Sequence, residues 1–174
     1  MMNRVKNQAG FTLIELVVVI VILGILAATA APRFINLQDD ANTATLQAVE
    51  ASMNSASSLV HAKSLIEGNQ NTAGGNGVDV DVNGGTAGGV VLVNFGYPRS
   101  NNAAAATSWS TDLLDIDVSN TGDFQISATA VAGSIVVFPR GQAAPTALTT
   151  PCIAFYTEAA AVGGTPNIGS VPCA

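Results

Sequence analysis

A single carboxylate, Glu15, lies inside the most apolar segment of the chain, residues 11–31. The segment reads FTLIELVVVIVILGILAATAA, and a helix of this length rises about 31 Å, enough to cross the hydrocarbon core of a membrane. A carboxylate at that depth costs on the order of a few kcal/mol and usually marks a function. The chemistry that we expect of Glu15 is therefore charge pairing among apolar helices.

The residues before this segment suggest the partner for that charge. Residues 1–10 are polar, carry two cations and end in Gly10. If a protease cut the chain after Gly10, a new α-amino group would appear at Phe11, four residues before Glu15. In an assembly of parallel, staggered helices, the amine of one subunit would approach Glu15 of its neighbour, neutralise two buried charges and fix the stagger. Cleavage would then permit assembly, because an uncut chain has no amine there.

Charges on either side of the apolar segment indicate its orientation. Arg4 and Lys6 precede it, and Asp39 and Asp40 follow it. Because flanking cations stay in the cytoplasm, we expect a cytoplasmic N-terminus and export of the remainder. An ordinary secretory signal peptide would have a shorter apolar run, with the cleavage site after that run.

The other candidates for chemistry do not form a catalytic set. His61 is the sole histidine, and no acid is placed beside it by a recognisable motif. We therefore expect a solvated or groove-packed side chain rather than a general base. The paired glycines lack the lysine and the strand-to-helix context of a phosphate-binding loop. We expect neither an enzyme nor a cofactor site.

Two acidic strings match the opening of a calcium-binding loop only in part. The first begins at Asp79 and has Val90 where a glutamate should close the loop. The second begins at Asp115 and has Asn120 where a glycine should stand. Alternation of side chains along strands explains both strings without a metal. We expect no metal site, with calcium at either string as the alternative.

Composition and charge exclude further classes. Hydrophobic residues make up 48% of the 174 residues and charged residues 10%, which is too apolar for a disordered chain. The net charge is −6, and without the first ten residues 4 cations and 12 acids remain, a net −8. Such a surface repels phosphate backbones, so we expect no general nucleic-acid binding.

Cys152 and Cys173 are the two cysteines, and their spacing matches no zinc or redox motif. If the chain is exported, a disulfide is the natural interpretation. Closing this loop would stabilise the fold by roughly 3 kcal/mol and would order a Gly- and Pro-rich tail.

A long helix must position these groups. Gly24 and Pro32 interrupt its pattern, since proline removes a backbone donor and glycine lowers helix propensity, so we expect Gly24–Pro32 to be the soft part. Beyond Pro32 one apolar stripe indicates an amphipathic helix that continues to about Glu67. The residues of the stripe are Leu46, Val49, Met53, Ala56 and Val60.

Alternating apolar residues between turn signals predict strands in the C-terminal part, at residues 78–82, 90–95, 124–130, 134–138 and 153–157. Residues 107–114 form a candidate short helix. Strands so close in sequence form antiparallel meanders. We predict an α+β domain in which the long N-terminal helix, whose first half is transmembrane, packs on an antiparallel β-sheet.

The string AGFTLIEL, residues 9–16, resembles the class III signal of type IV pilins and pseudopilins. The resemblance implies cleavage between Gly10 and Phe11 by a prepilin peptidase and N-methylation of Phe11, which leaves the amine cationic. It implies the pilin fold and a segment around Gly24 and Pro32 that is helical in the free subunit and melts in the fibre. The four parts implied are a leader (1–10), a transmembrane and assembly half-helix (11–31), an amphipathic half-helix (32–67) and a globular β-sheet head (68–174) with a disulfide-bounded C-terminal region.

The function implied is that of a major pilin, held in the bacterial inner membrane before assembly and in an extracellular fibre afterwards. Its partners would be other copies of itself, the inner membrane and pilus assembly machinery, and the prepilin peptidase. Segments 94–98 and 152–156 resemble, more loosely, the mannose-sensitive haemagglutinin pilins, which implies adhesion to surfaces or glycans. A type II secretion pseudopilin and a minor pilin that takes up DNA remain as alternatives, although pseudopilins usually lack the cysteine pair.

Overall fold

The computed structural model describes residues 10–74, 79–82 and 89–173, with the backbone alone for residues 31–36. The chain divides into two compact units, Met1–Gln38 and Asp39–Ala174. One helix, α1 (Leu13–Glu67), contributes to both units, and it runs through Gly24 and Pro32 without a break. Its end at Glu67 confirms the sequence prediction. The next residue, Gly68, adopts φ 78°, and the Asn69 N–H donates to the Ser64 carbonyl at 2.9 Å, which satisfies part of the helix end.

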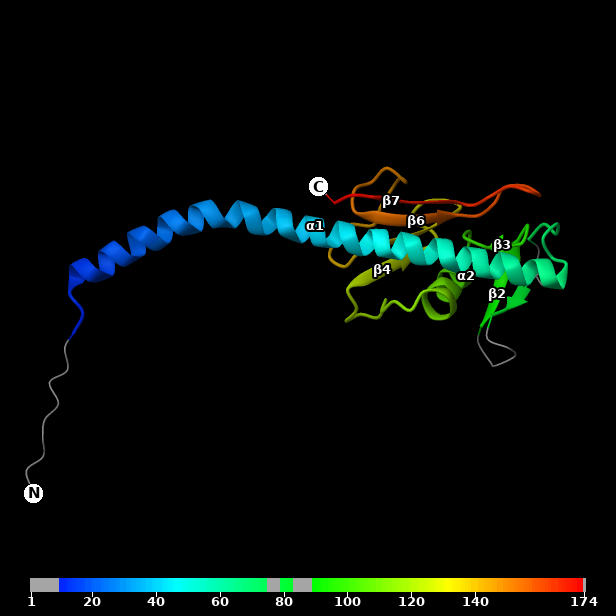
Figure 1. Cartoon of the computed structure of the whole chain (residues 1–174), viewed down its shortest axis with the longest axis horizontal. Helices are drawn as coiled ribbons and strands as arrows, with labels where there is room; N and C mark the ends of the chain where they lie inside the picture. Colours follow the sequence, from blue (N-terminus) through cyan, green and yellow to red (C-terminus); the bar gives the residue numbers. More distant parts are fainter. Residues whose placement is uncertain (1–9, 75–78, 83–88, 174) are drawn as a thin grey trace, which may run out of the picture. The chain divides into compact units, whose positions relative to one another are not determined.

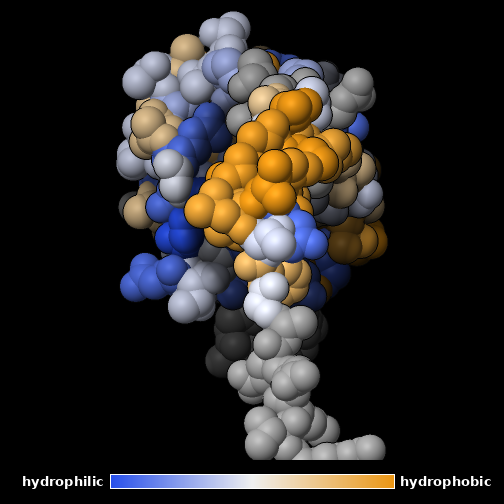
Figure 2. Space-filling model, turned by 90° about the vertical axis from the view of Figure 1, so that its left-hand side faces the viewer, coloured by the Kyte–Doolittle hydropathy of each residue, from blue (hydrophilic) through white to orange (hydrophobic). Residues whose placement is uncertain are grey.

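In the first unit, α1 exposes its apolar side chains on all sides. The span Leu13–Ala30 has a mean hydropathy of 2.8 and is long and apolar enough to cross a membrane, by length and composition. No part of this span is buried within the structure. Figure 2 views the molecule from the left-hand side of Figure 1. A continuous orange, apolar surface faces the viewer there.

In the second unit, the predicted stripe of α1 is buried against a four-stranded antiparallel sheet. The strands are β4 (Phe124–Ser127), β5 (Ser134–Pro139), β6 (Ile153–Thr157) and β7 (Asn167–Val171), in that order across the sheet. Leu46 and Met53 are fully buried in a cluster with Ile135 and Val137 of β5 and Tyr156 of β6. The opposite face of the sheet holds a second buried cluster, built from alternate residues of the same strands. Figure 1 shows β4, β6 and β7 beside the part of α1 that follows Asp39.

A second, three-stranded sheet packs near the end of α1. It consists of β1 (Asp79–Asp81), β2 (Val90–Asn94) and β3 (Tyr97–Pro98), all antiparallel. Val60, the last residue of the stripe, is buried with Val80, Val91 and Val93 of this sheet. A short helix α2 (Ala103–Ser108) and a π-helical turn η1 (Trp109–Leu113) follow. Trp109 of this turn is fully buried against Tyr156, at a ring centroid distance of 4.4 Å.

The α+β class is confirmed, with corrections to the details. Two sheets replace the single sheet that we expected. The strand expected at 124–130 ends at Ser127, because the Ser127 hydroxyl accepts the N–H groups of Thr129 and Ala130 and turns the chain. The helix expected at 107–114 begins earlier, at Ala103, because Asn102 caps it by accepting the Ala105 N–H at 2.7 Å. Strands β3 and β7 were not predicted, and residue 78 of the first predicted strand lies outside the described residues.

Candidate functional site

The peptide bond between Gly10 and Phe11 lies in non-helical chain, just before α1 begins at Leu13. Phe11 is 95% exposed, and a Cβ built on Gly10 would meet no atom within 4 Å. Exposed, irregular chain of this kind is where proteases act most readily. The structure thus leaves the predicted cleavage position open to an enzyme.

Glu15 and Thr12 are joined by three hydrogen bonds that run in both directions. The Thr12 backbone N–H and hydroxyl both donate to Glu15 Oε2, at 2.9 and 2.7 Å. In return, the Glu15 N–H donates to the Thr12 hydroxyl at 3.3 Å. This is a capping box, in which the first residue before a helix and the third residue within it satisfy each other's backbone donors. The carboxylate therefore closes the start of α1 as well as carrying charge.

Sequence reasoning treated Glu15 as an isolated acid and did not assign a role to Thr12. The signal was nevertheless present, because a threonine followed three residues later by glutamate before an apolar run is the pattern of a capping box. The box fixes the carboxylate at the positive end of the helix dipole, where negative charge is favoured.

The capped carboxylate retains the capacity to pair with a cation. An ionised carboxylate offers about four lone-pair positions, and Thr12 occupies positions on one of the two oxygens of Glu15. An open surface hollow of about 560 Å³ adjoins it, with walls that are otherwise mainly apolar. The hollow is lined by Phe11, Thr12, Leu13, Glu15, Leu16 and Val19. An amine that entered this hollow would find the carboxylate among apolar neighbours.

The other predicted assembly positions lie farther along α1. Gly24 is helical, and a Cβ built there would meet no atom within 4 Å, so the site has open space on its side of the helix. Position 32 is also within α1. The helix is thus continuous in this single chain, as the resemblance implies for a free subunit.

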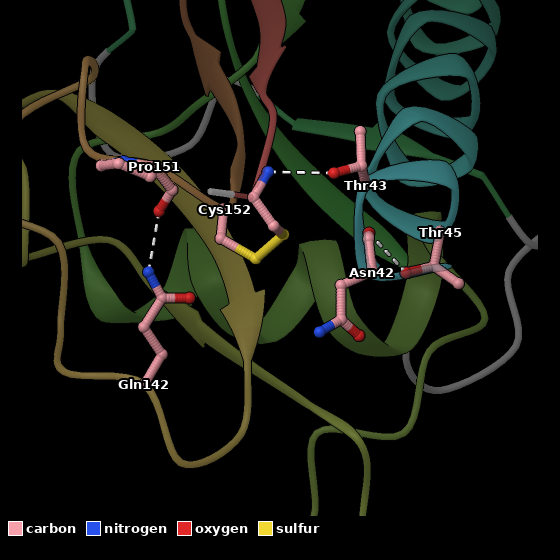
Figure 3. The surroundings of a disulfide bond; sticks show 7 residues. Asn42, Thr43, Thr45, Gln142, Pro151 and Cys152 are labelled. Atoms are coloured by element: carbon pink, nitrogen blue, oxygen red, sulfur yellow. Dashed lines mark hydrogen bonds between the residues drawn. A yellow bond between two sulfur atoms is a disulfide. The ribbon is translucent and has the colours of Figure 1, made fainter. Parts of the chain in front are cut away.

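Cys152 and Cys173 form a disulfide, which confirms the predicted pairing. Figure 3 shows its surroundings, where the Cys173 N–H donates to the Thr43 hydroxyl of α1 at 2.9 Å. A second link joins the same region to α1, since the Ser170 hydroxyl donates to Glu50 Oε2 at 2.6 Å. The segment between the cysteines contains β7 and is paired along β6, so the tail that we expected to be held by the disulfide alone is an edge strand.

The two acidic strings differ in what the structure describes. Part of the first lies outside the described residues, which end at Val82 and resume at Gly89. In the second, the Ser119 N–H donates to Asp117 Oδ1 at 2.8 Å, and the hydrogen bonds from Ser119 lower the pKa of the Asp117 carboxyl. The Arg140 guanidinium donates to the carbonyls of this loop, at Val118, Ser119, Gly122 and Phe124. The cationic side chain of Arg140 thus already binds these loop carbonyls. Within the described ranges, no three His, Cys, Asp or Glu side chains are grouped as a metal site would need.

His61 is packed in a groove, one of the two environments that we expected. Its ring stacks on Tyr97 at a centroid distance of 4.1 Å, and its Nδ1 lies 3.2 Å from the Gly96 carbonyl.

The comparisons with known proteins agree with these features of the N-terminal region. Residues 5–31 match the family described as the prokaryotic N-terminal methylation motif. A relative, the type IV narrow pilus major component PilA5 of Thermus thermophilus, is 53% identical over 58 residues, which cover 32% of this chain. The chain spans half the length of this relative. No solved structure matches the chain significantly. The methylation motif and the relative support the assignment of this chain to the type IV pilins.

Proposed function

We propose that the chain is the major structural subunit of a type IV pilus, which polymerises through its N-terminal helix into an adhesive surface fibre. The observation that supports this most directly is a capped carboxylate on an exposed apolar helix, next to an accessible Gly10–Phe11 bond. The protein performs no reaction itself in this proposal.

The first step is processing by a prepilin peptidase. Before cleavage, the apolar half of α1 anchors the subunit in the inner membrane, with the acidic remainder on the outer side. The enzyme hydrolyses the Gly10–Phe11 bond and methylates the new amine, which stays cationic. Processing also removes Arg4 and Lys6, the two cations that hold the N-terminus in the cytoplasm.

The second step is assembly, supported by the large exposed apolar surface of α1. Thirteen large hydrophobic side chains between Phe11 and Leu26 are 43–95% exposed, a surface that a membrane or other copies of the helix must cover. Packing of apolar helices alone does not define their stagger. The pair between the Phe11 amine of one subunit and Glu15 of its neighbour supplies that register. The segment Gly24–Pro32 lets the packed helices loosen and the fibre stretch.

Two measurements on the native host test this function. Electron microscopy should show abundant surface fibres that disappear when the chain is deleted, whereas unchanged fibres would indicate a minor pilin or a secretion pseudopilin. Mass spectrometry of the fibres should find chains that begin at a methylated Phe11. Fibres built from chains that keep their first ten residues would contradict the proposed assembly step.

A further inference from the structure

A small hollow lies where the end of α1, the β2–β3 turn and the loop before β7 come together. Its volume is about 190 Å³, below the roughly 300–1,000 Å³ of pockets that enclose drug-sized ligands. Its lining includes the ring-bearing residues His61, Phe95 and Tyr97 and the amide residues Gln70 and Asn71. It belongs entirely to the second unit, far in sequence from the residues that direct assembly.

Phe95 holds a strained backbone conformation at the edge of this hollow. Asn94 and Tyr97 are paired across β2 and β3, so Phe95 and Gly96 form a two-residue turn, with φ values of 50° and 82°. Such turns favour Asn-Gly or Gly-Gly, and a bulky residue with positive φ costs on the order of 1–3 kcal/mol. Gly96 is required sterically, because a Cβ there would lie 2.9 Å from His61 Nδ1. Nothing in the turn requires Phe95, which indicates a use for its ring.

The neighbouring rings are fixed in place. The rings of His61 and Tyr97 stack nearly parallel, at an interplanar angle of 3°. His61 Nδ1 faces the Gly96 carbonyl, which can only accept, so this hydrogen bond places a proton on Nδ1. Both side chains are half-buried, so part of each remains open to a ligand.

The polar groups of the lining are all uncharged. Gln70 and Asn71 are amide residues and Thr165 carries a hydroxyl, and no Asp, Glu, Lys or Arg is among the described residues that line the hollow. Gln70 Oε1 is buried without a hydrogen-bond partner in the part of the chain that is described. An unpaired buried acceptor is costly, so the Gln70 amide would gain by turning toward a hydroxyl donor in the hollow.

We propose that this hollow binds one pyranose ring of a neutral glycan. A sugar ring has an apolar C–H face that packs on aromatic rings and hydroxyl groups that bond to amides and imidazole, which is the combination present here. Nucleotides and acidic sugars would find no cationic partner in the lining. The proposal rests on the proposed function only for display of the site on a fibre, because binding requires the folded chain alone.

The test is fluorescence polarisation with the full-length chain in detergent micelles. The probes are labelled lactose, a β-1,4-linked glucose tetramer, a β-1,4-linked N-acetylglucosamine tetramer and a mannose trimer, with sialyllactose as the anionic comparison. At least one neutral probe should bind, and sialyllactose should bind more weakly than lactose. Absence of binding by every neutral probe, or stronger binding of sialyllactose, would overturn the proposal.

Phe95→Gly separates binding from folding. Removing the ring should weaken glycan binding at least tenfold, while relief of the positive φ should leave the unfolding temperature equal or higher. Val162→Ala, an exposed change in the same loop as Thr165 but outside the lining, should leave binding unchanged. Wild-type affinity in Phe95→Gly would overturn the proposal. If that variant also lost its fibres, the Phe95 ring would be assigned to contacts between subunits instead. Glycan binding by a chain that builds no fibres would refute the proposed function and leave this inference standing.

Discussion

The side chain of Asn94, the last residue of β2, donates to Glu158 Oε1 at 3.2 Å and so joins the two sheets of the second unit. The same amide donates to the Ala159 carbonyl, and its oxygen accepts the Gly74 N–H at 2.6 Å. Glu158 in turn accepts the Ser100 N–H at 2.8 Å. The three-stranded sheet is thus fastened to the loop after β6 by a polar junction.

Asn94→Ala should loosen this junction. It removes an acceptor and a donor and leaves half-buried partners unsatisfied, so we expect a loss of roughly 1–3 kcal/mol in the free energy of unfolding. Urea unfolding of the full chain in detergent micelles would measure it. Asn101→Ala is a matched control, because Asn101 is exposed and bonds to the same Glu158 oxygen at 3.3 Å. Equal effects of the two changes would contradict a special role of Asn94.

Local patterns in the sequence were enough to predict the helix and most of the strands. The stripe from Leu46 to Val60 is buried as its 3–4 spacing indicated, and β5 and β6 lie where alternation and turn signals put them. β7 was missed because its sequence, NIGSV, contains a glycine inside a Gly- and Pro-rich segment. Its pairing with β6 is non-local, and Gly169 leaves room for the Phe155 ring, because a Cβ there would lie 2.9 Å from Phe155 Cζ.

The functional residues divide in the same way, into those set by local sequence and those brought together only by folding. The roles expected for Gly10, Phe11 and Glu15 depend on neighbours in sequence, so the order of residues alone carries their pattern. The hollow beside Phe95 depends on three segments that meet only after folding, from position 61 to position 165. Its residues carry no shared sequence signal, so the sequence indicated a groove as one environment for His61 but could not name its neighbours.

Reduction of the disulfide should destabilise the second unit. Its loop spans 21 positions, for which chain entropy gives roughly 3 kcal/mol. The paired change Cys152→Ser with Cys173→Ser should lower the free energy of unfolding by about that amount under oxidising conditions, and added reductant should then have no further effect. Thr43→Val, which removes the acceptor for the Cys173 N–H and keeps the disulfide, should cost less, about 1 kcal/mol. A reductant-sensitive double variant would contradict the assignment.

Asp117 should contribute a pH-dependent part of the stability. Its pKa is lowered from 3.8 in the folded chain by the hydrogen bonds from Ser119, helped by Arg140. A lowered folded pKa means that the contribution is complete above pH 3.8 and is lost as the pH falls through the folded value. Asp117→Ala should therefore be less stable than wild type at neutral pH, and the difference should shrink in strongly acidic buffer. Thermal unfolding across this range would measure it, and a difference that grew on acidification would show the opposite sign.

The two roles of Glu15, capping the helix and pairing with an amine, can be separated by substitution. Glutamine also completes a capping box with threonine, so Glu15→Gln keeps the cap and removes only the charge. Thr12→Ala does the reverse, since it removes the capping hydroxyl at about 0.5–2 kcal/mol and leaves the carboxylate in place. If charge pairing sets the register, Glu15→Gln and Glu15→Val should insert in the membrane and yield few fibres with wild-type neighbours. Thr12→Ala should yield fibres in near-normal amounts. Fibre yield counted by electron microscopy, with membrane-bound subunit measured by immunoblot, decides between the two roles. Normal fibres from Glu15→Gln together with few from Thr12→Ala would make the carboxylate a helix cap and nothing more.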